Sequence, residues 1–140
     1  MPGKNGRKRQ VLYDTSMIIG YLRGNTKCKA KVEQVRSGKV IGFISVITVF
    51  ELYVGAFQAA NRAEALNDVR ELLSWFQPPL PLDEHIAQKV AYLFSDLQRS
   101  NELIELNDLF IGGTAVTLGL PIATLNRSHF SRIPKLKILD

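Results

Sequence analysis

The stretch from Leu106 to Phe130 constrains the fold most strongly, because it holds a helix, a turn and a strand in succession. Asn107 is predicted to cap the helix, and Asp108 then lies in the first turn, where the helix dipole favours a negative charge. Gly119 ends the helix, and the apolar run Pro121–Leu125 is predicted to be a strand. A strand that follows a helix so closely is typical of α/β folds.

Asp108 and Asn126 are the first candidate site residues in this stretch. Asn126 emerges at the carboxyl end of the predicted strand, which is the edge where open α/β sheets bind ligands. A capping carboxylate without a further role is the alternative for Asp108. Gly112 and Gly113 each cost the helix about 1 kcal/mol relative to alanine, so they predict close packing of its backbone against a neighbour.

Strands and helices alternate along the whole chain. This alternation favours an α/β fold in which a parallel sheet is covered on both faces and the strand ends gather at one edge. The predicted strands span residues 11–13, 40–44, 80–82, 121–125 and 136–139. The predicted helices span residues 17–22, 27–37, 46–58, 61–76, 84–100 and 107–118, and residues 127–132 form a turn or a short helix.

Glu51 is the only charged residue in the helix that follows the second strand and Ser45. The rest of this helix is apolar nearly all round, which predicts burial. An unpaired buried carboxylate costs several kcal/mol, so Glu51 must be neutralised, hydrogen-bonded or bound to a cation. A pairing with a core arginine is the structural alternative to a functional role.

Length and charge define the domain and its partners. The 140 residues are enough for one domain, expected over residues 11–140, preceded by a flexible basic arm over residues 1–10. The formal net charge of +5 favours a polyanionic partner. Cys28 is the only cysteine, which excludes an intramolecular disulfide and favours a reducing cytoplasm. No apolar run is long enough to span a membrane.

Three carboxylates and one amide are predicted to converge at the edge of the sheet. Asp14 and Asn126 follow strands, Glu51 lies in the helix after the second strand, and Asp108 lies at a helix start. Oxygen ligands without histidine or cysteine favour Mg²⁺ or Mn²⁺ over zinc, and such sites commonly take substrate phosphates. A divalent ion in such a site supports hydrolysis of a phosphodiester, which agrees with the basic net charge.

In their order and spacing, these residues resemble the PIN-domain ribonucleases of the VapC toxin type. The resemblance extends from Val11 to Leu139 and rests on four motifs. They are Asp14-Thr15-Ser16, Glu51, Asn107-Asp108 with Ile111-Gly112-Gly113-Thr114-Ala115, and Thr124-Leu125-Asn126 followed by His129-Phe130. It implies a three-layer α/β/α sandwich with a mostly parallel sheet, a Mg²⁺- or Mn²⁺-dependent endoribonuclease, a homodimer, and an antitoxin protein as inhibitor.

The resemblance also assigns roles to individual residues. It implies that Asp14, Glu51 and Asp108 are the catalytic metal ligands and that Asn126 assists them at a fourth catalytic position. Ser16 and Thr124 match hydroxyl residues of the family that stand beside the acids, and we group them with Arg127 as candidate substrate-binding residues. Arg132 and Lys135 are further candidate phosphate contacts, with a solvated charged rim as the alternative.

The chain departs from the usual family pattern at three places. His129 stands where an acid is common, Gly112-Gly113 replaces Ala-Ala, and Ser100-Asn101 replaces a glycine turn. With Asn126 neutral, the three carboxylates should bind a first metal ion more tightly than a second, which predicts one ion in the free protein. His129 is expected to be a surface residue, with proton donation to the leaving group as the alternative.

Two other functions compete with the nuclease. A phosphatase of the haloacid-dehalogenase type also has an aspartate after its first strand, but it needs a second aspartate where this chain has Ser16. A non-catalytic PIN-like module that binds RNA or a protein is the alternative outside enzymes. The three intact acids disfavour that module, whereas His129 favours it.

Overall fold

A three-stranded parallel sheet lies at the centre of the structure, a computed structural model that describes residues 7–140. The strands are β1 (Arg9–Tyr13), β2 (Val40–Ile44) and β3 (Ile122–Ala123), in the order β2-β1-β3. Single parallel bridges add Leu80 beside the end of β2 and Ile138 beside β3. The sheet is therefore parallel throughout, as the alternation of strands and helices predicts.

The register of the sheet brings three strand ends to one level. Tyr13 of β1 lies opposite Ile44 of β2 and opposite Ala123 of β3. The residues that follow directly are therefore neighbours at the carboxyl edge, and all three carry oxygen: Asp14, Ser45 and Thr124.

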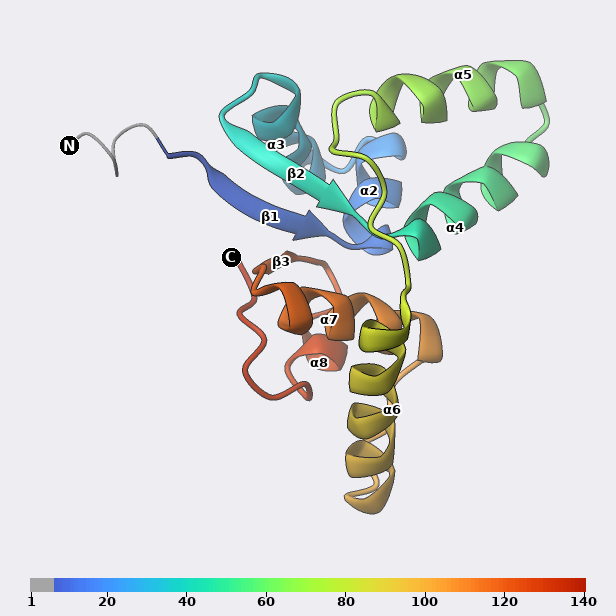
Figure 1. Cartoon of the computed structure of the whole chain (residues 1–140). Coiled ribbons are helices and arrows are strands. Elements are labelled where there is room, and N and C mark those ends of the chain that lie inside the picture. The colour runs from blue at the N-terminus through green and yellow to red at the C-terminus, as the bar shows by residue number, and fades with distance from the viewer. Residues whose placement is uncertain (1–6) are drawn as a thin grey trace.

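Helices cover both faces of the sheet (Figure 1), and two separate cores lie between the layers. Val11 and Tyr13 of β1 pack into the first core, and Leu12, which points to the opposite face, packs into the second. This arrangement confirms the predicted three-layer α/β/α sandwich. The first core includes residues of α2 (Thr15–Leu22), α3 (Thr26–Arg36), α4 (Val46–Phe57) and α5 (Arg62–Leu73), and the second includes residues of α6 (Glu84–Arg99), α7 (Leu106–Leu118) and α8 (Arg127–Phe130).

Several helix ends lie where local sequence signals predict them. Ser45 and Asp83 accept hydrogen bonds from backbone N–H groups in the first turns of α4 and α6. Gly119 ends α7 with φ 70°, a conformation that glycine adopts without steric cost. Apolar residues at helical spacing give α6 one face that is buried along its length, at Ile86, Val90, Leu93 and Leu97.

Other boundaries differ from the prediction. Strand β1 begins at Arg9, so the last two residues of the predicted basic arm are paired with β2, and residues 1–6 of that arm lie outside the described residues. The strands expected at 80–82 and 136–139 are single bridges, and β3 covers only two residues. Asn107 does not cap α7, because the helix begins one residue earlier and Glu105 holds the N-cap position.

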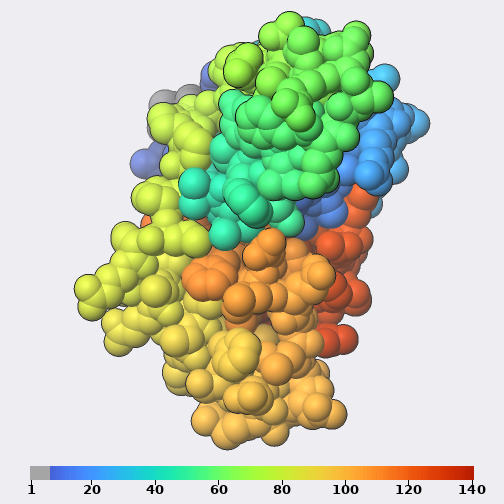
Figure 2. All heavy atoms as spheres, turned by 90° about the vertical axis from the view of Figure 1, so that its right-hand side faces the viewer, coloured from blue at the N-terminus to red at the C-terminus, as the bar shows by residue number. Residues whose placement is uncertain are grey.

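The prediction that α4 is buried all round is wrong. Phe50 is 63% exposed, Phe57 is 50% exposed and Val46 is 40% exposed, although Leu52 and Ala56 on the other side reach the core. Residues of α4 lie at the surface of the molecule in Figure 2. No helix within residues 7–140 is both long enough and apolar enough to cross a membrane.

Gly113 allows α6 and α7 to pack closely. A Cβ atom added there would lie 2.6 Å from Cγ2 of Val90, whose branched side chain has little rotamer freedom in a helix. We expect Gly113→Ala to lower the free energy of unfolding by about 1–2 kcal/mol, because overpacking outweighs the gain in helix propensity. A Cβ atom added at Gly55 in α4 meets no atom within 4 Å, so Gly55→Ala should stabilise the protein. Urea titration of both variants measures the two changes. Equal stabilisation by both variants would contradict the close packing.

Candidate metal centre

Asp14 lies at the end of β1 and caps α2. One carboxylate oxygen, Oδ1, accepts the backbone N–H of Met17 at 3.1 Å and the hydroxyl of Ser16 at 2.8 Å. The other oxygen accepts the hydroxyl of Thr124 at 2.7 Å, and this bond ties the end of β1 to the end of β3. The side chain is therefore held by groups from two strand ends and has little rotational freedom.

Glu51 projects from α4 toward the same edge and is half-buried. Its Oε1 atom accepts the hydroxyl of Thr15 at 2.6 Å, and its Oε2 atom accepts the amide of Asn107 at 3.3 Å. Thr15 also shares a hydrogen bond of 2.8 Å with Thr48. Polar groups thus hold Glu51 in place of the core arginine that the structural alternative required.

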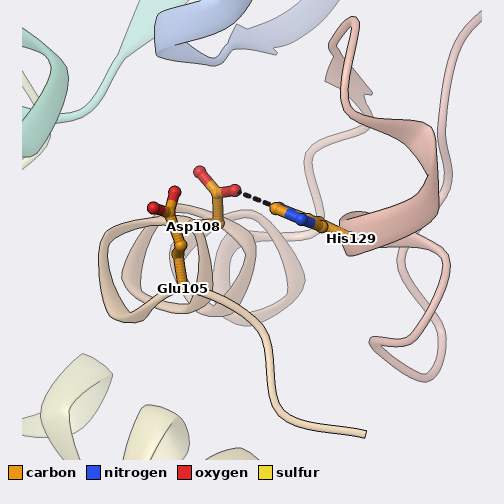
Figure 3. A group of neighbouring side chains, drawn as sticks. All are labelled: Glu105, Asp108 and His129. Atoms are coloured by element: carbon orange, nitrogen blue, oxygen red, sulfur yellow. Dashed lines mark hydrogen bonds and ion pairs between the residues drawn. The ribbon is translucent and has the colours of Figure 1, made fainter.

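Asp108 lies in the first turn of α7, as predicted, and is only 7% exposed. Its Oδ2 atom lies 2.7 Å from Nδ1 of His129, which belongs to α8. The His129 side chain is 34% exposed, and it also contacts a proposed metal ligand, which the expectation of a surface residue did not include. Figure 3 shows the imidazole of His129 directed at Asp108. Glu105 lies beside Asp108, at the start of α7.

An open cavity of about 470 Å³ collects these groups at the carboxyl edge of the sheet. Glu51, Asp108 and Asn126 line it, so three of the four predicted catalytic residues share one space. Asp14 is buried and does not line the cavity, but its neighbours Thr15 and Ser16 do. The charge of Asp108 is close enough to disfavour ionisation of Asp14. The remaining lining residues are Ile19, Gly20, Arg23, Asn25, Glu105 and Leu125.

The donor set fits a hard divalent cation. Carboxylate oxygens from Asp14, Glu51 and Asp108 and the amide oxygen of Asn126 are the ligand types that Mg²⁺ and Mn²⁺ prefer. Within residues 7–140, no lysine or arginine forms an ion pair with any of the three acids. Carboxylates gathered without lysine or arginine repel one another, and a bound cation would offset that repulsion.

Burial raises the pKa of Asp14 from its ordinary value of 3.8 to about 6. The hydrogen bonds from Thr124, Ser16 and Met17 act in the opposite direction, and the charge of Asp108 adds to the rise. Because the folded protein then holds this proton more tightly than the unfolded chain, Asp14 favours folding below pH 3.8, and the contribution is lost as the pH rises through about 6.

We therefore expect the metal-free protein to lose stability between pH 4 and pH 7 relative to the Asp14→Asn variant, by up to about 3 kcal/mol. The comparison isolates Asp14, because both proteins share every other titrating group. Urea unfolding in the presence of a chelator at several pH values measures the difference. A difference that does not change with pH would mean that Asp14 titrates at its ordinary pKa.

The three predicted substrate-binding residues lie in different surroundings. Ser16 lines the cavity, and its oxygen also accepts the backbone N–H of Leu125 at 3.0 Å. Thr124 is only 2% exposed and uses its hydroxyl to position Asp14. Arg127 does not line the cavity, since its guanidinium donates to the backbone oxygen of Leu139 at 3.1 Å. Substrate binding by these residues stays a prediction.

Sequence reasoning missed four residues that take part in this site. Glu105 and Arg23 line the cavity, and Thr15 and Asn107 hold Glu51. The acid three positions before Asp108 was the available signal for Glu105, because residues at that spacing share one face of a helix. Nothing local to Thr15 or Asn107 indicates a contact with α4, since those contacts join segments far apart in the chain.

Comparisons with known proteins agree with this architecture. The sequence matches the model of the PIN domain family over residues 11–136. It is 31% identical over 132 residues to a protein named Ribonuclease VapC from Rickettsia bellii (strain RML369-C). The matched region covers 92% of this chain and 94% of that protein.

Two solved structures are similar in fold and in sequence. The crystal structure of DNA-bound VapBC from Salmonella typhimurium includes a chain that matches with a TM-score of 0.83 and 25% identity, covering 96% of this chain and 98% of the other. A toxin-antitoxin complex from Klebsiella pneumoniae matches with a TM-score of 0.71 and 26% identity, covering 90% of this chain and 94% of the other.

Proposed function

Because the chain belongs to the PIN domain family, we propose that it is a divalent-metal-dependent endoribonuclease and the toxin of a toxin–antitoxin pair. Mg²⁺ or Mn²⁺ is the proposed cofactor, and RNA is the proposed substrate. The relative named Ribonuclease VapC and the similar chain in a toxin-antitoxin complex support this proposal.

The observation that carries the proposal is a set of three acids that gather at the cavity and, within residues 7–140, form no ion pair with a lysine or arginine. Glu51 comes from α4, Asp108 from α7 and Asp14 from the end of β1, yet all three lie at one edge of the sheet. Burial is the main cause of the raised pKa of Asp14, and the charge of Asp108 adds to it, so an ionised Asp14 is costly to the metal-free protein. A cation bound among the three acids would offset this cost.

Each residue has a distinct part in the proposed reaction. Asp14, Glu51 and Asp108 hold the cation, and Asn126 offers an amide beside it. A bound divalent ion supplies activation of water and stabilisation of the charge on the phosphodiester. Arg23 lines the same cavity and is placed to contact a phosphate of the RNA backbone.

Cleavage of RNA by the purified protein tests the proposed activity. We expect products from a single-stranded RNA with Mg²⁺ or Mn²⁺, none with a chelator, and recovery when the metal is added back. A DNA strand of the same sequence serves as the control for a general phosphodiesterase. RNA cleavage that continues undiminished in the chelator would contradict the proposal.

The exposed apolar face of α4 supports a homodimer as the functional form. Phe50 is the most exposed residue of this face, and a ring of that size in water favours a protein contact. We expect the protein to sediment as a dimer and Phe50→Asp to weaken the dimer about 30-fold or more, as for a central interface residue. Leu118 lies at the end of α7 and is 48% exposed. Leu118→Asp is the control and should leave the dimer intact. A wild-type monomer at all concentrations would contradict the proposal.

A second cavity supports an antitoxin as the protein partner. It has a volume of about 250 Å³, lies among α2, α4 and α5, and shares Arg23 and Glu51 with the metal centre. A partner segment bound there would lie beside the catalytic acids and could block them. We expect a cognate antitoxin to protect this surface from hydrogen exchange and to inhibit cleavage. Inhibition without protection of this surface would contradict the placement.

One observation favours the alternative of a non-catalytic RNA- or protein-binding module. His129 occupies a position where the family commonly has an acid, and its contact with Asp108 engages one oxygen of a proposed ligand. The alternative predicts binding of RNA without cleavage under every metal condition. The cleavage assay above separates the two functions.

A further inference from the structure

A second group of metal-ligating side chains lies beside the proposed metal centre. Glu105 and Asp108 stand at the start of α7, and His129 reaches them from α8 (Figure 3). One ligand atom from each residue lies within 4.8 Å of the others. Of the three, only Asp108 belongs to the carboxylate set that the sequence predicts.

The contact between Asp108 and His129 has the spacing of two ligands on one ion. Their Oδ2 and Nδ1 atoms are 2.7 Å apart. Neighbouring ligands of an octahedral ion with bonds of about 2.1 Å lie about 3 Å apart, so both atoms could bind one cation after a small movement. His129 is 34% exposed, and its ring therefore remains reachable from solvent.

Glu105 is free to turn toward such a cation. It holds the N-cap position of α7, but its side chain makes no capping hydrogen bond, and within residues 7–140 no lysine or arginine forms an ion pair with it. It lines the same cavity as Glu51 and Asp108. Its charge is a fourth negative charge at the site, beyond the three that the sequence predicts.

We propose that Glu105, Asp108 and His129 form a second cation position, which shares Asp108 with the metal centre and prefers a first-row transition-metal ion to Mg²⁺. The inference rests on the proposed metal-dependent function, because it places a further ion beside the first. This second position binds its ion more weakly than the first, because Asp108 serves both ions, so it is occupied only when metal is in excess.

The preference follows from the nitrogen donor. Mg²⁺ selects oxygen ligands and water, whereas imidazole is a good ligand for transition-metal ions. A site with two carboxylates and one imidazole therefore distinguishes Mn²⁺ from Mg²⁺ better than a site made only of oxygen. His129→Asp converts the position to an all-oxygen site of similar size, which makes the nitrogen the variable under test.

Pulsed electron paramagnetic resonance of Mn²⁺ tests the position directly. The full chain, without a histidine tag, receives one equivalent of Mn²⁺ in excess Mg²⁺, and electron spin echo envelope modulation reports nitrogen bound to Mn²⁺. We expect a ¹⁴N coupling in the wild-type protein. It should disappear in His129→Gln and persist in His85→Gln, which removes the only other histidine, an exposed residue of α6.

Competition between the two ions provides a second measurement. We expect the wild-type protein to retain this Mn²⁺ at Mg²⁺ concentrations about ten-fold higher than His129→Asp does, and Glu105→Gln to weaken the Mn²⁺ affinity by about 10-fold or more. Circular dichroism confirms that each variant is folded, and RNA cleavage is measured on the same samples.

The combined result separates the two proposals. Mn²⁺-dependent cleavage without ¹⁴N coupling overturns the second cation position and leaves the nuclease in place. A ¹⁴N coupling that depends on His129, without cleavage under any condition, supports the cation position and overturns the proposed function. A coupling that persists in His129→Gln also overturns the second position.

Discussion

Asp108→Asn should lower metal-dependent RNA cleavage at least about 100-fold, because loss of a direct ligand should exceed the 10- to 100-fold effects typical of groups that only support a ligand. Asparagine keeps the size of the side chain and can still share a hydrogen bond with His129. The substitution removes the charge that attracts the cation and also removes its repulsion with Asp14. The fold should therefore be retained.

The matched control is Asp96→Asn, which makes the same chemical change on α6. Asp96 is an exposed residue paired with Arg99, and such a surface pair contributes about 1 kcal/mol or less. Cleavage rates with saturating Mn²⁺ and circular dichroism spectra are compared for the three proteins. Undiminished cleavage by Asp108→Asn would point to a contaminating nuclease and refute the assignment.

Glu51→Gln should reduce cleavage by a similar factor and should abolish the stabilisation that metal gives to the folded protein. At a metal concentration 100 times the dissociation constant, binding raises the free energy of unfolding of the wild-type protein by about 2.7 kcal/mol. The variant keeps one acceptor oxygen for Thr15 and lacks the charge, so its melting temperature should barely respond to Mn²⁺.

Thermal melts with and without Mn²⁺ measure this difference. Glu71→Gln, at an exposed position of α5, is the control and should respond to metal as the wild-type protein does. Without metal, Glu51→Gln should melt at or above the wild-type temperature, because one repelling charge is gone. A metal-free variant that melts many degrees lower would show that Glu51 is a structural group.

The hydrogen bonds of Asp14 determine which substitution tests it best. The sequence predicts that Asp14 follows a strand, and an alanine substitution would remove it as a metal ligand. The structure shows that Asp14 also caps α2, so alanine would remove a cap contribution of about 1 kcal/mol together with the charge. Asparagine retains a side-chain oxygen for the cap and separates the two effects.

Features encoded by neighbouring residues were predictable from the sequence. Ser45 and Asp83 act as caps through hydrogen bonds to N–H groups two and three residues later, and Gly119 ends its own helix. The buried face of α6 follows from apolar residues at helical spacing. The convergence of Asp14, Glu51 and Asp108 was predictable because parallel strands place their carboxyl ends at one edge.

Features that join distant segments were not predictable in this way. The pattern of α4 shows that it is apolar, but it does not show which apolar residues remain for a partner, and Phe50 proved to be exposed. The bridges at Leu80 and Ile138 depend on pairing across the sheet. The contact of His129 with Asp108 depends on how α8 packs beside α7, which no local signal encodes.

Anomalous X-ray diffraction from crystals soaked in Mn²⁺ tests the metal centre most directly. The account predicts a peak at the carboxyl edge of the sheet, bound by oxygen atoms of Asp14, Glu51 and Asp108 at about 2.2 Å. The same soak of Asp108→Asn crystals should show a much weaker peak. A wild-type map with no peak among these three carboxylates, in a crystal of an active protein, would contradict the account.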